Sequence, residues 1–373
     1  MRSEALETAA PPTPSRPDLE RIWPYIPGLH RTEIEREFGV RDVLKLASNE
    51  NPLGPSPRAL AALERLGPEA HRYPDSQALV LREALAARHG VDLEQIVVGN
   101  GSVECIDLVA RAFLRPGDEA VVGFPSFPRF QIACQIVGVQ PTVVPHVDWA
   151  FDLDGLRAVV SERTRVVFLD DPCNPTGTRI GPSDLAALLD DLPPDTLVLL
   201  DRAYYEFVTP EDRFEEDVER IRGGANLIVL RTFSKAYGLA GLRVGYAVAR
   251  AEHARALDRV REAFNTSVFA QAAALAALGD DEHVAATVRL VEKERDWLRG
   301  RLDRLGLAVV RSATNFLFTD LGPGAASIDR ELLRRGIIVR PMSAPGIKTR
   351  ARISIPARPG GERLVAALEE ILA

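Results

Sequence analysis

The sequence contains few cysteines, only three among 373 residues. Cys105, Cys134 and Cys173 stand far apart, so they indicate neither a disulfide framework nor the ligand spacing of a zinc site. The six histidines are also scattered, and none forms a pair at the helical spacing of metal ligands. We therefore expect no metal site and a protein that works in a reducing compartment.

The sequence also lacks long apolar runs and an excess of positive charge. No stretch approaches the roughly 18 uninterrupted apolar residues of a membrane helix. The segment Met1 to Pro17 has no apolar run typical of a signal peptide. With 46 basic and 53 acidic residues, the net charge of −7 disfavours nucleic-acid and membrane partners. We expect a cytoplasmic globular protein of about two or three domains.

Short apolar segments alternate with helical patterns through the middle of the chain. The strand candidates are residues 96–98, 119–122, 165–169, 196–200 and 227–230. This alternation indicates an α/β fold with a mostly parallel sheet flanked by helices. Polar and glycine-rich segments follow several of these strands, and open α/β sheets bind ligands beyond the carboxyl ends of their strands. We therefore expect the functional site at that edge.

The pattern changes after about residue 270. Leu298, Leu302 and Leu305 lie at helical spacing, and strand candidates follow at 315–319, 336–339 and 351–355. This order indicates a smaller α+β domain. We predict an arm at 1–45 that joins the small domain and is disordered as far as Pro17, a large domain at 46–268 and the small domain at 269–373.

Lys235 follows the apolar strand candidate 227–230 in the segment Thr232-Phe233-Ser234-Lys235. Most lysines are solvated surface charges, but here hydroxyls and glycines surround the amine and Arg243 follows. Pyridoxal 5′-phosphate (PLP) needs an amine that forms a Schiff base and later moves a proton. Ser234 and Arg243 can bind its phosphate. Lys235 is thus the candidate carrier of PLP.

Three further residues could contact the cofactor ring. Asp201 ends the strand candidate 196–200 and could keep a pyridinium nitrogen protonated, although a helix cap is the simpler role. Asn174 could donate to the ring oxygen or could be a turn residue of Asn174-Pro175-Thr176-Gly177. Tyr204 is a second candidate donor to that oxygen.

The segment Gly99-Asn100-Gly101-Ser102 joins a strand candidate to a helical pattern. It could be a bare turn, but its place would aim backbone N–H groups and a helix dipole at a phosphate. It lacks the third glycine and the downstream acid of a dinucleotide fingerprint, and the Gly-Lys-Ser/Thr of a P-loop. A cofactor phosphate therefore suits it better than a nucleotide.

Taken in order, Gly-Asn-Gly-Ser, Asn-Pro-Thr-Gly, Asp-x-Ala-Tyr and Ser-Lys-x7-Arg resemble the aspartate aminotransferase superfamily, which is fold type I of the PLP enzymes. Within it, the sequence resembles the histidinol-phosphate aminotransferases in four segments, from about Tyr25 to the C-terminus. These segments are Tyr25–Gly28, Lys45–Pro52, which contains Asn49, Arg72–Asp75 and Ile337–Pro341.

The resemblance implies a role for each matching residue. Lys235, Asp201 and Tyr204 would be catalytic, with Lys235 as the proton shuttle. Tyr73 would reach the phosphate from the neighbouring subunit, so the implied form is a homodimer with shared active sites. The other implied cofactor ligands are Ser102, Val103, Phe127, Asn174, Ser234 and Arg243. The implied substrate ligands are Arg352, whose planar fork suits a carboxylate or phosphate, with Arg340, Tyr25 and Asn49.

Three residues depart from the usual family pattern. Val103 stands where the family has an acid, Arg202 where it commonly has Glu, and Cys173 where it often has Asn. None of these replaces a group that PLP chemistry requires. Because all three fall in segments around the expected site, they bear on which substrate is bound.

The resemblance implies an aminotransferase, with histidinol phosphate as first candidate donor and 2-oxoglutarate as acceptor. Alternatives are an aromatic or specialised-metabolite aminotransferase, and a PLP decarboxylase that acts on a phosphorylated amino acid. A non-catalytic PLP-binding regulator is a further alternative. Such regulators carry a DNA-binding domain, for which the segment before Tyr25 is too short.

Overall fold

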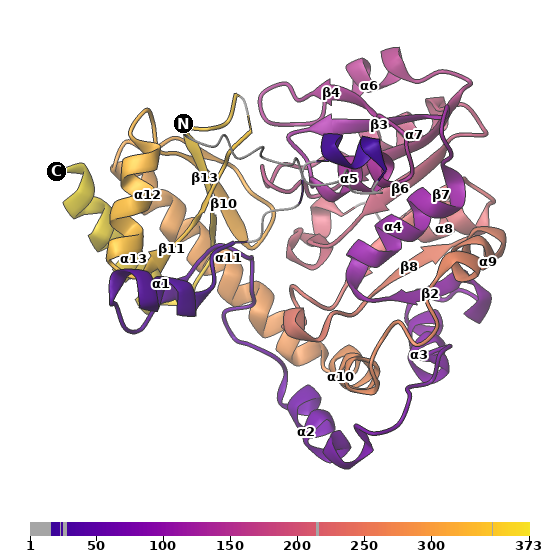
Figure 1. The fold of residues 1–373 in the computed structure, drawn as a ribbon, viewed down its shortest axis with the longest axis horizontal. Helices are drawn as coiled ribbons and strands as arrows, with labels where there is room; N and C mark the ends of the chain where they lie inside the picture. The colour runs from indigo at the N-terminus through magenta and orange to yellow at the C-terminus, as the bar shows by residue number, and fades with distance from the viewer. Residues whose placement is uncertain (1–15, 23, 25–27, 214–215, 345) are drawn as a thin grey trace, which may run out of the picture.

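The computed structural model describes residues 16–22, 24, 28–213, 216–344 and 346–373. Its largest element is a seven-stranded sheet (Figure 1). In sheet order the strands are β2 (Ile96–Gly99), β8 (Gly245–Ala249), β7 (Leu227–Thr232), β6 (Leu197–Asp201), β5 (Thr164–Asp170), β3 (Glu119–Phe124) and β4 (Thr142–Pro145). The predicted α/β fold is therefore confirmed.

The strands from β7 through β4 pair in parallel, and β8 alone runs against its neighbours β2 and β7. The five strands predicted in this region are present with ends shifted by one or two residues, whereas β4 and β8 were not predicted. Because β2, β3, β5, β6 and β7 point the same way, their carboxyl ends lie along one edge of the sheet.

Helices cover both faces of this sheet, so the sequence alternates between two cores. Along β5, Val166 and Phe168 pack on one face while Val167 and Leu169 pack on the other. The first face is covered by α4 (Gly101–Phe113), α5 (Arg129–Ile136) and α9 (Ala251–Val260). The second is covered by α3 (Leu79–His89), α6 (Leu153–Val159), α7 (Pro182–Asp191) and α8 (Asp217–Arg222). Helices α2 (Pro57–Leu66) and α10 (Val268–Leu278) pack on each other and extend this core beyond α3.

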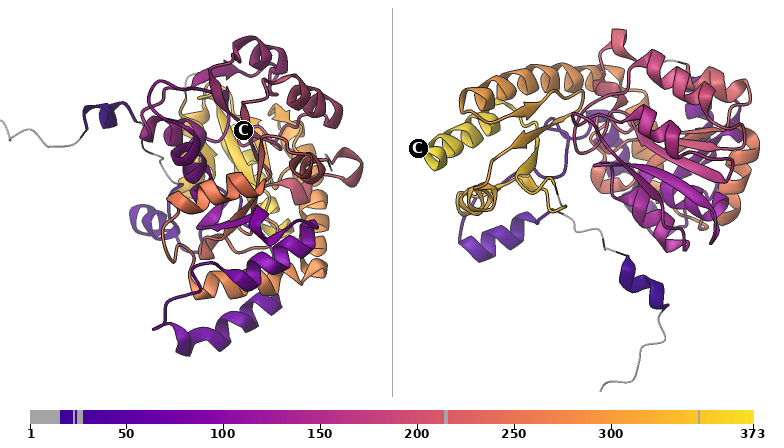
Figure 2. Two further views of the ribbon diagram at one scale, coloured as in Figure 1. Left: turned by 90° about the vertical axis from the view of Figure 1, so that its right-hand side faces the viewer. Right: turned by 90° about the horizontal axis from the view of Figure 1, so that it is seen from above.

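A smaller unit lies beside the large sheet (Figure 2). Its four-stranded antiparallel sheet has the order β12 (Arg340–Pro341), β13 (Arg350–Ser354), β10 (Phe316–Asp320) and β9 (Val309–Val310). Leu298, Leu302 and Leu364 belong to the core of this unit. The helices that supply this core are α11 (Asp281–Arg304), α12 (Ala325–Arg334) and α13 (Arg358–Leu372).

An N-terminal segment packs on the smaller unit. Strand β1 (Leu44–Lys45) pairs in parallel with β11 (Ile337–Ile338). Ile34 of helix α1 (Arg31–Phe38) packs in a small core with Ile338. The predicted disordered segment falls mostly within residues 1–15, outside the described residues, and the domain limits at 45 and 268 stay a proposal. Among the described residues, no helix has both the length and the hydropathy that a membrane span requires.

Candidate active site

A cavity of about 250 Å³ opens where β5, β6 and β7 end and where the smaller unit meets the large sheet. Most of the residues singled out in the sequence line it. They are Asn49, Ser102, Val103, Phe127, Asn174, Asp201, Tyr204, Ser234, Lys235, Arg243 and Arg352. The predicted position at the carboxyl edge of the sheet is where the structure brings these residues together.

Lys235 lies in the turn after β7, anchored by the fully buried Phe233. Its Nζ donates a hydrogen bond to the carbonyl oxygen of Ser48 at 3.1 Å and lies 5.7 Å from the centre of the Tyr204 ring. Burial lowers the pKa of Lys235 to about 7, and the positive charge of Arg352 acts in the same direction. A large fraction of the amine is therefore neutral near neutral pH, which is the form that attacks an aldehyde.

Asp201 is the last residue of β6 and is buried in the floor of the cavity. Its Oδ1 accepts a hydrogen bond from the backbone N–H of Ala203 at 3.0 Å. Burial raises the pKa of this carboxyl to about 7, against the opposing effects of that N–H and of Lys235. A buried carboxyl of this kind gains from a cationic partner, and a protonated pyridine nitrogen supplies one.

Hydrogen bonds at the cavity join residues of the large sheet region to residues of the smaller unit. The Tyr204 hydroxyl accepts from Asn49 Nδ2 at 2.9 Å, and Asn49 N donates to Ser354 Oγ at 2.8 Å. On β13, Arg352 donates to Asn174 Oδ1 and to the carbonyl oxygen of Ala47, the latter at 2.8 Å. Arg352 is thus a buried cation that reaches the cavity beside Asn174.

The turn between β2 and α4 forms a cradle at the other end of the cavity. Gly101 has φ +74°, and a side chain there would collide with Arg243 Nη2. Arg243 also donates to Ser234 Oγ at 3.4 Å. A side chain at Gly245 would collide with the backbone N–H of Ser102. Two glycines therefore let a guanidinium and a strand approach the first turn of α4.

Two of the sequence-predicted residues that the structure describes, Tyr73 and Arg340, do not line this cavity. Tyr73 is 83% exposed and stacks on Phe264, with ring centroids 4.7 Å apart. Arg340 lines an adjacent cavity of about 130 Å³, which shares Phe127, Asn174 and Arg352 with the first. Tyr25 lies outside the described residues.

Asp170 is a cavity residue that the sequence did not single out. It ends β5 in register with Asp201, and its Oδ2 accepts from the N–H groups of Asn174 and Phe127. Burial, with Asp201 nearby, raises the pKa of Asp170 well above its ordinary value. Its place at the end of the strand before β6 is a sequence signal that could have identified it.

The structure shows where the side chains of Arg202 and Cys173, two of the three residues that depart from the family pattern, point. Arg202 points away from the cavity into a buried ion cluster, 2.5 Å from Asp171 and 3.7 Å from Asp217. The Cys173 thiol is buried and donates to the carbonyl oxygen of Pro125 at 3.4 Å. Val103 is the one departure that lines the cavity.

The donor set fits PLP. The cradle of Gly101, Ser102 and Arg243 offers N–H groups and a guanidinium to a phosphate, and Asp201 is a buried acid in the same cavity. The Lys235 amine has no acidic hydrogen-bond partner among the described contacts, so it is available to an aldehyde. Such a cavity could bind the cofactor and move a proton beside it.

The comparisons with known proteins agree with this geometry. The family described as aminotransferase class I and II matches residues 41–371. The histidinol-phosphate aminotransferase of Moorella thermoacetica is 44% identical over 94% of this chain and 91% of its own length. That of an Anaeromyxobacter species is 46% identical over 95% of this chain and 98% of its own length.

Among solved structures, the chain is similar to histidinol-phosphate aminotransferase from Sinorhizobium meliloti in complex with pyridoxal 5′-phosphate. The TM-score is 0.88 at 29% identity, covering 97% of this chain and 98% of that one. The fold and the family predicted from the sequence motifs are confirmed. The chain belongs to the class I and II aminotransferases.

Proposed function

We propose that this chain is a PLP-dependent histidinol-phosphate aminotransferase that uses 2-oxoglutarate as amino acceptor. The observation that carries the proposal is one cavity that holds a half-buried lysine, a buried acid and an anion cradle beside Arg352. Full-length relatives of that name, at 44% and 46% identity, support it.

Each residue has a proposed part in the reaction. Bound PLP supplies an electron sink that weakens bonds at the carbon next to the substrate nitrogen. Lys235 would hold the cofactor through its Nζ, be released by the substrate amine, and then move the proton. Asp201 would keep the pyridine nitrogen protonated, while Asn174 and Tyr204 would donate to the ring oxygen. Phe127 would provide an aromatic face for the ring.

The phosphate of the cofactor is assigned to the cradle. Ser102 and the backbone N–H of Val103 lie at the start of α4, where the helix dipole favours an anion. Ser234 and Arg243 close the cradle from the turn after β7 and from the residues before β8. Backbone donation explains why Val103 can replace an acid, since the amide remains.

The substrates are assigned to the arginine side of the cavity. Histidinol phosphate carries a phosphate and 2-oxoglutarate carries two carboxylates, so both present an anionic end. Arg352 is buried in the cavity, and Arg340 lines the adjacent one that shares a wall with it. A planar guanidinium binds either group in a bidentate manner. Asn49 positions this wall, and Tyr25 is proposed as a further phosphate ligand.

We also propose that the chain works as a homodimer with shared active sites. Tyr73 and Phe264 form an exposed aromatic pair, and exposed apolar side chains lie close by in sequence on α2 and α3. They are Leu60, Leu79 and Val80. A stacked aromatic pair left exposed to solvent suits a contact surface. Tyr73 would then complete the cradle of the neighbouring subunit. A cytoplasmic location stays a prediction.

The test is a panel of amino donors with 2-oxoglutarate, in which glutamate formation is followed for histidinol phosphate, phenylalanine and tyrosine. We expect histidinol phosphate to give the highest kcat/KM. A preference for phenylalanine or tyrosine would contradict the substrate and favour an aromatic aminotransferase. Release of carbon dioxide from a phosphorylated amino acid, without any acceptor, would instead identify a decarboxylase.

A further inference from the structure

The first turn of α4 has no side-chain cap. Asn100 occupies the N-cap position, and its side chain accepts no hydrogen bond from the turn. The first N–H groups of a helix lack partners within the helix and normally need a side chain, water or ligand. In this chain the amides at Ser102 and Val103, which line the cavity, are left for an anion. Something else must therefore hold the turn in place.

The side chain of Glu104 reaches back along the turn and fixes its backbone by a hydrogen bond. Its Oε2 accepts a hydrogen bond from the backbone N–H of Asn100 at 2.5 Å and another from Asn265 Nδ2 at 2.6 Å. Glu104 is not among the residues that line the cavity. Its carboxylate therefore acts on the backbone of the turn from outside the cavity.

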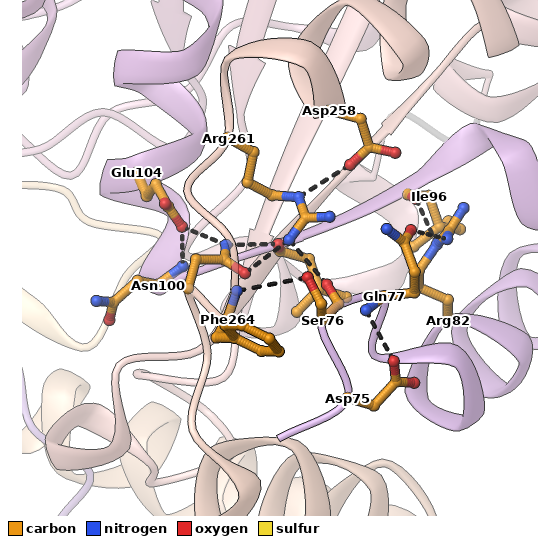
Figure 3. A network of polar contacts seen from close by, with 12 residues as sticks. Asp75, Ser76, Gln77, Arg82, Ile96, Asn100, Glu104, Asp258, Arg261 and Phe264 are labelled. Carbon is orange, nitrogen blue, oxygen red and sulfur yellow. Dashed lines mark hydrogen bonds and ion pairs between the residues drawn. The ribbon is translucent and has the colours of Figure 1, made fainter. Parts of the chain in front are cut away.

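Asn265 is fixed in turn by other contacts. Figure 3 shows Glu104, Arg261 and Asp258 of the same network. The Nδ2 of Asn265 also donates to the carbonyl oxygen of Val98 at 3.1 Å, and its Oδ1 accepts from Arg261 Nη1 at 3.0 Å. Arg261 is paired with Asp258 at 2.9 Å and donates to the carbonyl oxygen of Ser76 at 2.9 Å. The network thus joins the end of β2, the turn and the segment that follows Tyr73.

We propose that Glu104, oriented by Asn265, is the positioning residue of the phosphate-binding turn and acts as a hydrogen-bond acceptor. The negative charge of Glu104 would oppose rather than favour the binding of a dianionic phosphate. Its contribution is to fix the Asn100 N–H and so the direction of the two amides that follow. This inference rests on PLP as the cofactor, and the test separates the two.

The test measures cofactor affinity by absorbance titration of cofactor-free protein, using two probes. PLP carries the phosphate, whereas pyridoxal carries the same aldehyde and ring without it. Glu104→Ala is expected to weaken PLP binding by roughly 10- to 100-fold, the size of lost hydrogen bonds to a charged group. Its affinity for pyridoxal should not change. Glu104→Gln keeps an acceptor oxygen and should bind PLP as tightly as the unaltered protein.

Two further variants complete the test. Asn265→Ala should weaken PLP binding in the same direction, because it releases Glu104 without touching the turn itself. Glu94→Ala, an exposed glutamate of the short helix Leu93–Gln95, is the matched control and should leave both affinities unchanged. Thermal unfolding of each cofactor-free variant checks that the chain is folded.

Three results would overturn the inference: no change of PLP affinity in Glu104→Ala, equal losses of PLP and pyridoxal affinity, or a loss in Glu104→Gln as large as in Glu104→Ala. Equal losses would mean a general structural role. A large loss in Glu104→Gln would mean that the charge is needed. Failure of the unaltered protein to bind PLP would instead contradict the proposed function.

Discussion

At the scale of single residues, the cavity is defined by the half-buried Lys235 and the buried Asp201, whose pKa values move toward each other. Burial lowers the pKa of Lys235 and raises that of Asp201, each to about 7. Both shifts have the same cause, since a site that excludes water disfavours the charged form of an acid and of a base alike. A cofactor with an aldehyde and a basic ring nitrogen gives each group the partner it lacks.

The lowered pKa of Lys235 predicts how cofactor binding depends on pH. Only the neutral amine attacks the aldehyde of PLP, and it is the minor form below about pH 7. The rate of reconstitution of cofactor-free protein should therefore rise as pH increases through about 7 and level off above it. Absorbance measured after rapid mixing checks this. A rate that keeps rising to pH 10 would mean that Lys235 has an ordinary pKa.

Arg352 is predicted to act through substrate binding. Arg352→Ala should raise KM for histidinol phosphate and for 2-oxoglutarate by roughly 10- to 100-fold, the size of a lost charge-assisted hydrogen bond. Arg352→Lys should recover only part of this, because an ammonium cannot form the bidentate pair. Steady-state kinetics gives the comparison.

Arg358→Ala is the matched control for this prediction. Arg358 pairs with Glu294 at 2.7 Å at the start of α13 and lines neither cavity. Its loss should leave both KM values unchanged. An Arg352→Ala variant with unaltered KM would remove this arginine from the substrate site.

At the scale of elements, the turn between β2 and α4 depends on a backbone conformation that favours glycine. Gly101→Ala introduces a side chain at φ +74° and drives it into Arg243. We expect a loss of stability of roughly 1–2 kcal/mol from the backbone alone, with a further loss of PLP affinity. Chemical denaturation and absorbance titration measure the two effects.

Gly117→Ala is the control that separates backbone strain at a positive φ from the collision with Arg243. Gly117 has φ +98°, no atom lies within 4 Å of an added Cβ, and the residue is not part of the cavity. This variant should show the stability loss with unchanged PLP affinity. If Gly101→Ala and Gly117→Ala behaved alike in the PLP titration, the cradle would have no special need for glycine at 101.

Much of the arrangement of strands and helices could be predicted from the sequence. The central strands were visible because each is a short apolar segment that ends in polar or glycine-rich residues, as β6 ends in Asp201. The Glu104 to Asn265 contact could not be predicted, since 161 positions separate the two residues. Strand β8 was missed because Gly245–Ala249 follows the lysine segment with only the short 3-10 helix Ala240–Leu242, and no α-helix, between them.

At the scale of the whole molecule, the cavity lies where two cores meet. Tyr204 and Phe207, which follow β6, pack in the core of the smaller unit with Phe316. Arg352 lies on β13 of that unit and Asn49 is hydrogen-bonded to it, whereas Asp201 ends β6 of the large sheet and Lys235 follows β7. The sequence could not predict where the Arg202 side chain points, because its partners Asp171 and Asp217 are distant in sequence and only the folded chain brings them together.

The proposed dimer predicts complementation between two defective chains. If Tyr73 completes the neighbouring site, a Lys235→Ala chain paired with a Tyr73→Ala chain contains one site with both residues intact. Mixing the two variants should restore tight PLP binding and activity to one of the two sites in each mixed dimer. Each variant alone is the control. No recovery in a confirmed mixed dimer would mean that Tyr73 does not act across the interface.

The central claim is that Lys235 is the residue that holds the cofactor. The chain has four lysines, at positions 45, 235, 293 and 348, so the attachment can be assigned without ambiguity. Borohydride reduction of the PLP-loaded protein fixes the bond, and mass spectrometry of its peptides then locates the added mass. We predict the adduct on Lys235 and its loss in Lys235→Ala. An adduct on another lysine, or none on Lys235, would contradict the account.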